Sequence, residues 1–261
     1  MLVALAPSAG PAGAIIGGEE DSANAFANVG QLEITDGADW FGFCSGTLIA
    51  PDVVVTAAHC TAWIVAEEIP LEALRVNFNP APGDPSDPAD PYAYGMAAIE
   101  VHPGFFDVPF VQGLNAKRVL ASPFEDISLV WLTEVVDGVT PAPVAYEGYL
   151  DELDLRDETF TAVGYGLSGF GRGSAVSPNG EGIYLGTRNF RHVTALGEDA
   201  FPDRFLKISA GVCLGDSGGA LFHGDTLVAI NVWTYSLRCT GPNLEYRLDS
   251  SIAQAFLAEH L

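Results

Sequence analysis

Residues 215–219 read Gly-Asp-Ser-Gly-Gly and place one serine hydroxyl inside a glycine-rich turn. Glycine permits the tight backbone on which the Oγ of Ser217 is exposed. The backbone amides of Gly215 and Ser217 can then face a carbonyl oxygen that gains negative charge. This run predicts a nucleophile with an anion-stabilising backbone, although taken alone it also fits an ordinary polar turn.

Two upstream segments supply a base and an acid. His59 follows the apolar run 53–55, and Asp126 precedes the mostly apolar run 127–130. Taken singly, the histidine fits a structural role and the aspartate fits a turn or cap. Acyl transfer needs an imidazole that takes the serine proton and a carboxylate that orients this imidazole. We therefore predict that His59, Asp126 and Ser217 act together.

Short apolar segments separated by turn residues dominate the chain after residue 14. They predict strands at 42–49, 53–57, 127–132, 160–163 and 227–232. The proline- and aspartate-rich segment 79–91 and the glycine-rich segment 164–186 are expected to be surface loops.

The C-terminal segment differs from the rest of the chain. It predicts a helix capped by Asp249, Ser250 or Ser251, with an apolar face of Ile252, Phe256 and Leu257. Many short strands followed by one helix indicate an all-β barrel or sandwich architecture in two halves, divided near 135–149.

The chain is strongly acidic, with 34 acidic against 11 basic residues and a formal net charge of −23. This charge repels nucleic acid and anionic membrane surfaces, so we expect neither as a partner. No run approaches the roughly 18 apolar residues that span a bilayer. A solvated acidic surface explains the charge, while adaptation to high salt and a preference for cationic substrates remain alternatives.

Four cysteines fall into two local pairs, one around His59 and one around Ser217: Cys44 with Cys60, and Cys213 with Cys239. The absence of a CxxC spacing argues against zinc and thioredoxin chemistry. Two short-range disulfides in an oxidising compartment are favoured, and closing the first loop is worth roughly 3 kcal/mol.

The N-terminal segment 1–14 carries a processing pattern. Its first six residues are apolar, Pro11 breaks a helix, and Ala12-Gly13-Ala14 has the small-x-small pattern that signal peptidase accepts. We expect a signal peptide remnant or propeptide and therefore a secreted protein, extracellular or periplasmic. A disordered alanine-glycine tail is the alternative.

Six segments in this order and approximate spacing resemble the trypsin/chymotrypsin-like serine proteases: Ile15-Ile16-Gly17-Gly18, Cys44-Ser45-Gly46-Thr47-Leu48-Ile49, Thr56-Ala57-Ala58-His59-Cys60, Asp126-Ile127-Ser128-Leu129, Gly164-Tyr165-Gly166 and Gly215-Asp216-Ser217-Gly218-Gly219. The resemblance runs from residue 15 to the terminal helix. It implies two six-stranded antiparallel β-barrels, about 15–135 and about 136–248, with a helix at about 249–261 and the active site between the barrels.

The resemblance implies a role for each matched residue. His59 would be the general base and then the acid, Asp126 its orienting partner and Ser217 the nucleophile, with the amides of Gly215 and Ser217 as the oxyanion hole. It pairs Cys44 with Cys60 and Cys213 with Cys239. It also implies protein or peptide substrates, protein protease inhibitors as possible partners, a monomer, and no cofactor.

In the resembled family a newly released N-terminal amine pairs with the aspartate before the nucleophile. The corresponding groups here are Ile15 and Asp216. Residue 14 is alanine rather than the basic residue after which most relatives are cut. Our hypothesis is that signal peptidase cuts after Ala14 and itself exposes the amine of Ile15.

The resemblance also places the primary specificity pocket, with Gly211 at its base and Val212 beside it. Trypsin-type enzymes carry an aspartate at that base, so cleavage after Lys or Arg is not expected. The wall comprises Val232, Trp233 and Thr234, with Leu244 as a further apolar contribution. Thr234 replaces a common glycine and is expected to narrow the pocket entrance. The run Gly211-Val212-Cys213 resembles elastase-type enzymes, which accept small or medium aliphatic residues. Such a preference is graded, at about 1–3 kcal/mol per methylene.

Some features depart from the resembled family. Val232 stands where relatives usually have a serine that bonds the triad aspartate, and two disulfides frequent in animal relatives are absent. Asp84, Asp87 and Asp90 lie where some relatives bind calcium, but without regular ligand spacing, so a solvated loop and no metal are expected.

These residues predict a secreted serine endopeptidase that acts through an acyl-enzyme intermediate. The alternative from another class is a non-catalytic protease homologue that binds partners, although a pure binding module does not require His59, Asp126 and Ser217 together. Esterase activity is expected as a side activity at most.

Overall fold

The computed structural model describes residues 15–84, 86, 89–105, 124–167, 186–198, 203–236 and 239–261. Segment 1–14, most of the expected glycine-rich loop 164–186, and Asp87 lie outside these residues. None of the helices within them is both long and apolar enough to cross a membrane.

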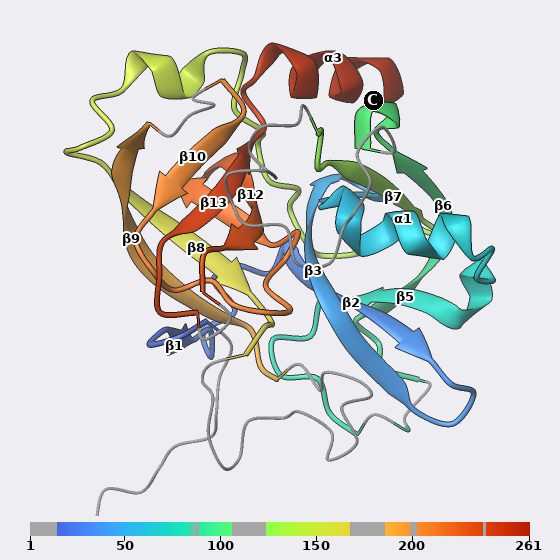
Figure 1. The fold of residues 1–261 in the computed structure, drawn as a ribbon. Helices are drawn as coiled ribbons and strands as arrows, with labels where there is room; N and C mark the ends of the chain where they lie inside the picture. The colour runs from blue at the N-terminus through green and yellow to red at the C-terminus, as the bar shows by residue number, and fades with distance from the viewer. Residues whose placement is uncertain are drawn as a thin grey trace, which may run out of the picture.

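The first barrel is closed by six antiparallel strands in the order β2-β3-β4-β7-β6-β5 (Figure 1). Their bounds are β2 (Val29–Thr35), β3 (Trp40–Ala50), β4 (Val53–Thr56), β5 (Leu74–Asn77), β6 (Ala93–Val101) and β7 (Ser128–Leu132). Branched apolar side chains such as Val54, Val76 and Val130 are fully buried inside it, which is the environment that favours β-branched residues in strands.

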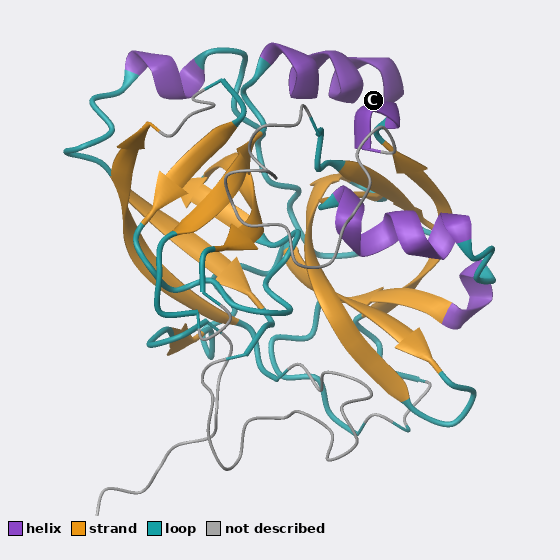
Figure 2. Cartoon of the chain, in the orientation of Figure 1, coloured by secondary structure: helices purple, strands orange, loops and turns teal. Residues whose placement is uncertain are grey.

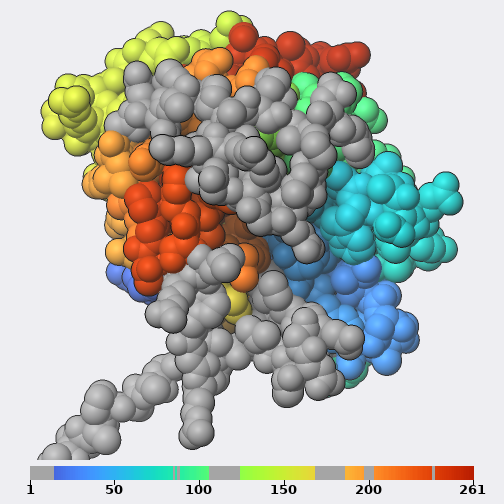
Figure 3. Space-filling model, in the orientation of Figure 1, coloured from blue at the N-terminus to red at the C-terminus, as the bar shows by residue number. Residues whose placement is uncertain are grey.

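The second barrel contains β8 (Thr159–Gly164), β9 (Asn189–Glu198), β10 (Phe205–Ile208), β11 (Ala220–His223), β12 (Thr226–Thr234) and β13 (Asn243–Arg247). It closes because β8 pairs with both β11 and β9. The expected fold class is therefore confirmed, and so are the strands expected near 42–49, 53–57, 127–132, 160–163 and 227–232. Figure 3 shows the two halves side by side on one face of the molecule.

The N-terminal segment joins the barrel that follows later in the chain. Strand β1 (Glu19–Glu20) pairs with β9 of the second barrel. The fully buried guanidinium of Arg188 fixes this segment: its Nε lies 2.8 Å from Asp21 Oδ2, and one Nη donates to the Val29 carbonyl at 2.9 Å and to the Tyr165 hydroxyl at 3.1 Å. One buried cation therefore connects the N-terminal segment to both barrels.

Few helices accompany the strands, and they lie on the outside of the barrels (Figure 2). The expected terminal helix is present as α3 (Ser251–His260), and Ser250 is its N-cap, accepting from the Ala253 amide at 3.2 Å. Short turns of 3-10 helix lie at η1 (Leu71–Ala73), η2 (Pro103–Phe105) and η3 (Tyr149–Glu152). The helix α1 (Ala58–Ala66) was not expected, because its apolar sequence directly continues that of β4.

Candidate active site

His59 lies in the first turn of α1 and is held by Asp126 at two points. Its Nδ1 lies 2.8 Å from Asp126 Oδ2, and its backbone N–H donates to Asp126 Oδ1 at 2.9 Å. The aspartate is buried and the imidazole is partly exposed. Burial lowers the pKa of His59, but the charge and hydrogen bond of Asp126 outweigh it, so this pKa is raised. Such a pair orients an imidazole and stabilises its protonated form.

The helix that carries His59 is itself fixed to the barrel. Thr61 on α1 donates to the Ser128 hydroxyl at 2.8 Å, and Ser128 donates to the Glu100 carbonyl at 2.9 Å. The disulfide between Cys44 and Cys60 joins α1 to β3. The imidazole therefore projects from a backbone that is restrained on two sides.

The nucleophile segment of the second barrel docks against the first barrel. Ser45 donates its backbone N–H to the Ser217 carbonyl at 2.8 Å, and Cys60 Sγ lies 3.6 Å from the same carbonyl. Gly218, at φ +78°, has no room for a side chain, because a Cβ would overlap the Ser45 carbonyl and the Thr56 hydroxyl. This contact places Ser217 beside the disulfide that flanks His59. Among the described residues, no hydrogen bond joins Ser217 Oγ to that imidazole.

The predicted oxyanion donors have no hydrogen-bond acceptor within the described part of the chain. Gly215 has φ +93°, and its carbonyl accepts from the Ser45 hydroxyl at 2.9 Å. The backbone N–H groups of Gly215 and Ser217 donate to no group in the described part of the chain. From the sequence, Ser45 was only one residue of a matched motif. In the structure its hydroxyl donates to the Gly215 carbonyl and its amide to the Ser217 carbonyl, so that it holds the nucleophile segment.

Asp216 is fully buried and binds two backbone amides. It accepts from Gly166 at 2.7 Å and from Cys213 at 2.8 Å. Burial raises the pKa of Asp216 to about 7, and the two amides offset only part of that rise. In this uncleaved chain the Ile15 nitrogen is part of a peptide bond, but Ile15 is already buried, and the Ile16 amide donates to the Gly211 carbonyl at 2.8 Å.

The predicted pocket residues lie at two neighbouring places. Gly211 and Val212 are buried, and the Asn243 side chain contacts Val212 in both directions, accepting from its amide at 3.3 Å and donating to its carbonyl at 2.9 Å. Val232, Trp233 and Thr234 lie at the end of β12, which pairs with β13. Asn243 was not among the predicted pocket residues, because the pairing of β13 with both β10 and β12 is what brings it beside Val212.

The sequence model of the family described as Trypsin matches residues 15–73 and 112–252. The chain belongs to the trypsin family. Hypodermin-B of Hypoderma lineatum is 25% identical over 95% of this chain and 88% of its own length. A chymotrypsin-like serine proteinase of Haliotis rufescens is 24% identical over 90% of this chain and 88% of its own.

The solved structure described as human heparin binding protein matches this trypsin-family fold with a TM-score of 0.63. It is 16% identical and covers 95% of this chain and 96% of its own. At that identity the match supports the fold alone. Together with the relative named as a serine proteinase, the match to the trypsin family supports a peptidase hydrolase at the level of the family.

One group of potential metal ligands occurs among the described residues of this trypsin-family chain. Cys44, His59 and Cys60 approach one another, but both sulfur atoms are used in a disulfide. The second disulfide, between Cys213 and Cys239, leaves no free cysteine among these residues. In the loop 79–91, Asp84 bonds to Ser86, and Asp90 accepts from Asn77 and Asn79.

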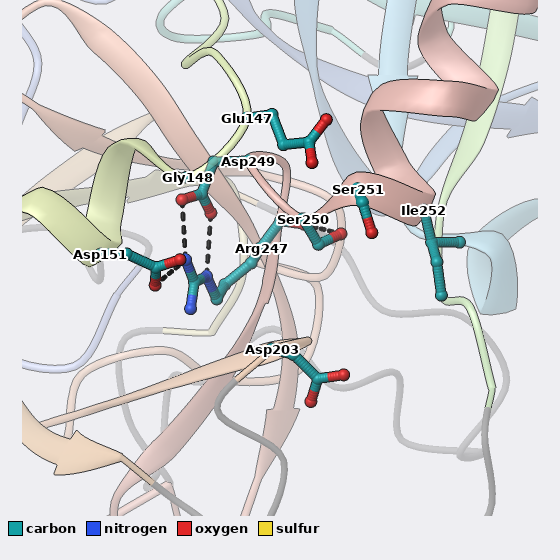
Figure 4. A pocket seen from close by; sticks show the side chains of 9 residues that line it. All are labelled: Glu147, Gly148, Asp151, Asp203, Arg247, Asp249, Ser250, Ser251 and Ile252. Atoms are coloured by element: carbon teal, nitrogen blue, oxygen red, sulfur yellow. Dashed lines mark hydrogen bonds and ion pairs between the residues drawn. The ribbon is translucent and has the colours of Figure 1, made fainter.

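A polar pocket elsewhere on the molecule does not include the predicted active-site residues (Figure 4). It lies at the start of α3, where Arg247 contacts Asp151 and Asp249 at 2.8 Å each. Its lining residues are Glu147, Gly148, Asp151, Asp203, Arg247, Asp249, Ser250, Ser251 and Ile252. Arg247 therefore already neutralises part of the acidic charge there.

Proposed function

We propose that the chain is a secreted serine endopeptidase that hydrolyses peptide bonds through an acyl-enzyme intermediate. The observation that carries this proposal is the two-point contact between His59 and Asp126, at 2.8 and 2.9 Å. It supplies an oriented base beside the segment that bears Ser217. The two disulfides fit an oxidising compartment and therefore secretion.

In the proposed mechanism, Ser217 Oγ attacks the peptide carbonyl while His59 Nε2 takes the hydroxyl proton. The carbonyl oxygen becomes an anion, which the free amides of Gly215 and Ser217 stabilise. His59 then gives the proton to the leaving amine. Water, activated by the same imidazole, hydrolyses the acyl-enzyme and restores Ser217. Asp126 keeps Nδ1 protonated throughout, so that Nε2 is the basic nitrogen.

We propose that the α-amine of Ile15, once released, pairs with Asp216. The hydrogen bond from Ile16 to Gly211 and the burial of Ile15 support this, because both already hold the start of this segment against the second barrel. An ammonium ion would neutralise a carboxylate that burial disfavours. N-terminal sequencing of the secreted protein tests the signal-peptidase route, and a mature terminus other than Ile15 contradicts it.

For specificity we propose small or medium aliphatic P1 residues, since Gly211, Val212 and Thr234 offer a narrow and mainly apolar lining. A peptide library varied at P1, assayed on the mature protein at mildly acidic pH, tests this. Preferred cleavage after Ala or Val supports the proposal, and preferred cleavage after Lys or Arg at that pH contradicts it. We further propose the domain bounds given above, a monomeric state and inhibition by protein protease inhibitors.

A fluorophosphonate probe tests the catalytic proposal directly. We expect one covalent adduct on Ser217 of the mature protein and none on the variant Ser217→Ala. The variant Ser45→Ala, which keeps the nucleophile but removes the hydroxyl bonded to Gly215, is expected to label more slowly. Absence of an adduct on the correctly folded mature protein would instead favour the non-catalytic binding module.

A further inference from the structure

Glu245 is a buried carboxylate that the proposed mechanism does not use. It lies on β13 and is fully shielded from solvent. The backbone amide of Val232 acts weakly on this carboxylate, yet neither carboxylate oxygen meets the geometry of a hydrogen bond with any described group. An ionised carboxylate in such a place is strongly disfavoured, so an unpartnered one requires a functional explanation.

A second unpartnered acceptor lies opposite Glu245. Asn231 on β12 is its direct cross-strand neighbour, and directly opposed residues project from the same face of a sheet. The Asn231 Nδ2 donates to the carbonyls of Val163 and Asp216, which fixes the amide orientation. Its Oδ1 has no partner within the described residues. Three acceptor oxygens at adjacent positions therefore lack a donor.

These acceptors face the loop that forms the predicted specificity pocket. Asn243 and Glu245 are two residues apart on β13, so their side chains share one face. Asn243 on that face bonds to the backbone of Val212, and Glu245 lies close to the amide of Val232. Both valines are predicted pocket residues. The carboxyl of Glu245 thus adjoins the floor of the pocket from inside the second barrel.

We propose that Glu245, with Asn231, is a specificity-determining element beneath the primary pocket: uncharged it admits an aliphatic P1 residue, and charged it favours a P1 side chain with a cationic tip. This deepens the proposed protease function and rests on it. Neutral, the carboxyl can donate its own proton to Asn231 Oδ1 and satisfies both groups. Ionised, it needs an external donor, which an ammonium group on an aliphatic stem provides.

The charged groups around Glu245 are consistent with a carboxyl that is neutral at low pH and ionises as pH rises. Asp216 is the titratable group whose charge acts on it, and burial together with this charge raises the pKa of Glu245 well above its usual value. The β12 side contributes the uncharged Asn231. On β10, Lys207 extends over the Tyr235 ring, and on β9 the Arg191 guanidinium beside Gly211 donates to the Ile16 carbonyl.

The test compares two peptide substrates that differ only in the P1 tip, ornithine and its uncharged isostere norleucine. The ratio of their kcat/KM values is measured on mature protein from mildly acidic to mildly alkaline pH. We expect the ornithine-to-norleucine ratio to rise at least about tenfold with pH in the wild type, which corresponds to about 1.4 kcal/mol. In the variant Glu245→Gln, which is isosteric and always neutral, the ratio should stay at its acidic value.

A matched control is the variant Glu33→Gln, which removes another buried carboxyl with a raised pKa, but in the first barrel. In this variant the ornithine-to-norleucine ratio should rise with pH as it does in the wild type. An ornithine-to-norleucine ratio that does not change with pH in the wild type overturns the proposal, and this measurement depends on no variant. A rise of the ratio in Glu245→Gln equal to that in the wild type overturns it as well. Failure of the protease function itself is distinguishable. In that case the fluorophosphonate probe does not label the mature protein and neither peptide is cleaved, whereas failure of the specificity proposal leaves labelling and cleavage intact.

Discussion

At the residue scale, the role proposed for Asp126 is to orient and charge-stabilise His59, which it contacts at two points. The variant Asp126→Asn keeps the shape of the contact but loses the charge that raises the pKa of His59. We expect kcat to fall by about 10,000-fold and the acidic limb of the pH–rate profile to move to lower pH. Steady-state kinetics across pH measure both. Asp90→Asn, in the loop 79–91, is the control and should change neither, while an unshifted acidic limb in Asp126→Asn would contradict the assigned role.

Gly218 provides a second test at this scale. The variant Gly218→Ala should slow fluorophosphonate labelling by at least about 100-fold, because the new Cβ displaces the segment that carries the proposed oxyanion donors. Gly224→Ala is the matched control: it also has a positive φ, +59°, but nothing lies within 4 Å of its added Cβ. That variant should lose about 1–2 kcal/mol of stability and keep its labelling rate. Equal labelling rates in the two variants would refute the steric argument.

At the element scale, the cap of α3 can be tested separately from catalysis. Ser250 accepts from the Ala253 amide and donates to the Arg247 carbonyl, whereas the neighbouring Ser251 is exposed. We expect Ser250→Ala to lower the free energy of unfolding by about 1 kcal/mol, and Ser251→Ala to change it little. Urea unfolding measures the difference. Labelling of Ser217 should be unchanged in both variants, and a larger loss in Ser251→Ala would contradict the assignment of the cap.

The elements also show which parts of the molecule local sequence can predict. Strands such as β4 follow from consecutive β-branched residues, and α3 follows from its cap and apolar face. Helix α1 has no capping side chain at Ala57 and is apolar on most sides, so it resembles an extension of β4. Asn243 and Glu245 come to lie beside the predicted pocket residues through the register of β13 with β10 and β12, and a register between two strands cannot be inferred from either strand alone.

At the scale of the whole molecule, the proposed pairing of Asp216 with the Ile15 amine predicts a link between chain cleavage and stability. In the uncleaved chain its pKa is raised to about 7 by burial, so the folded state binds its proton more tightly than the unfolded state does. Stability from this group is therefore fully present below its ordinary pKa and is lost as pH rises through about 7. The loss is on the order of 4 kcal/mol.

Urea unfolding of the uncleaved Ser217→Ala chain across pH measures this loss. The same chain with Asp216→Asn is the reference, because all the other acidic residues contribute their own pH dependence to both chains. The difference in unfolding free energy between the two should fall as pH rises from mildly acidic to neutral. A Ser217→Ala chain that begins at Ile15 should not show this fall, since its ammonium ion stabilises the ionised carboxylate. An identical pH dependence with and without Asp216 would refute the link, and an identical one before and after cleavage would refute the pairing with Ile15.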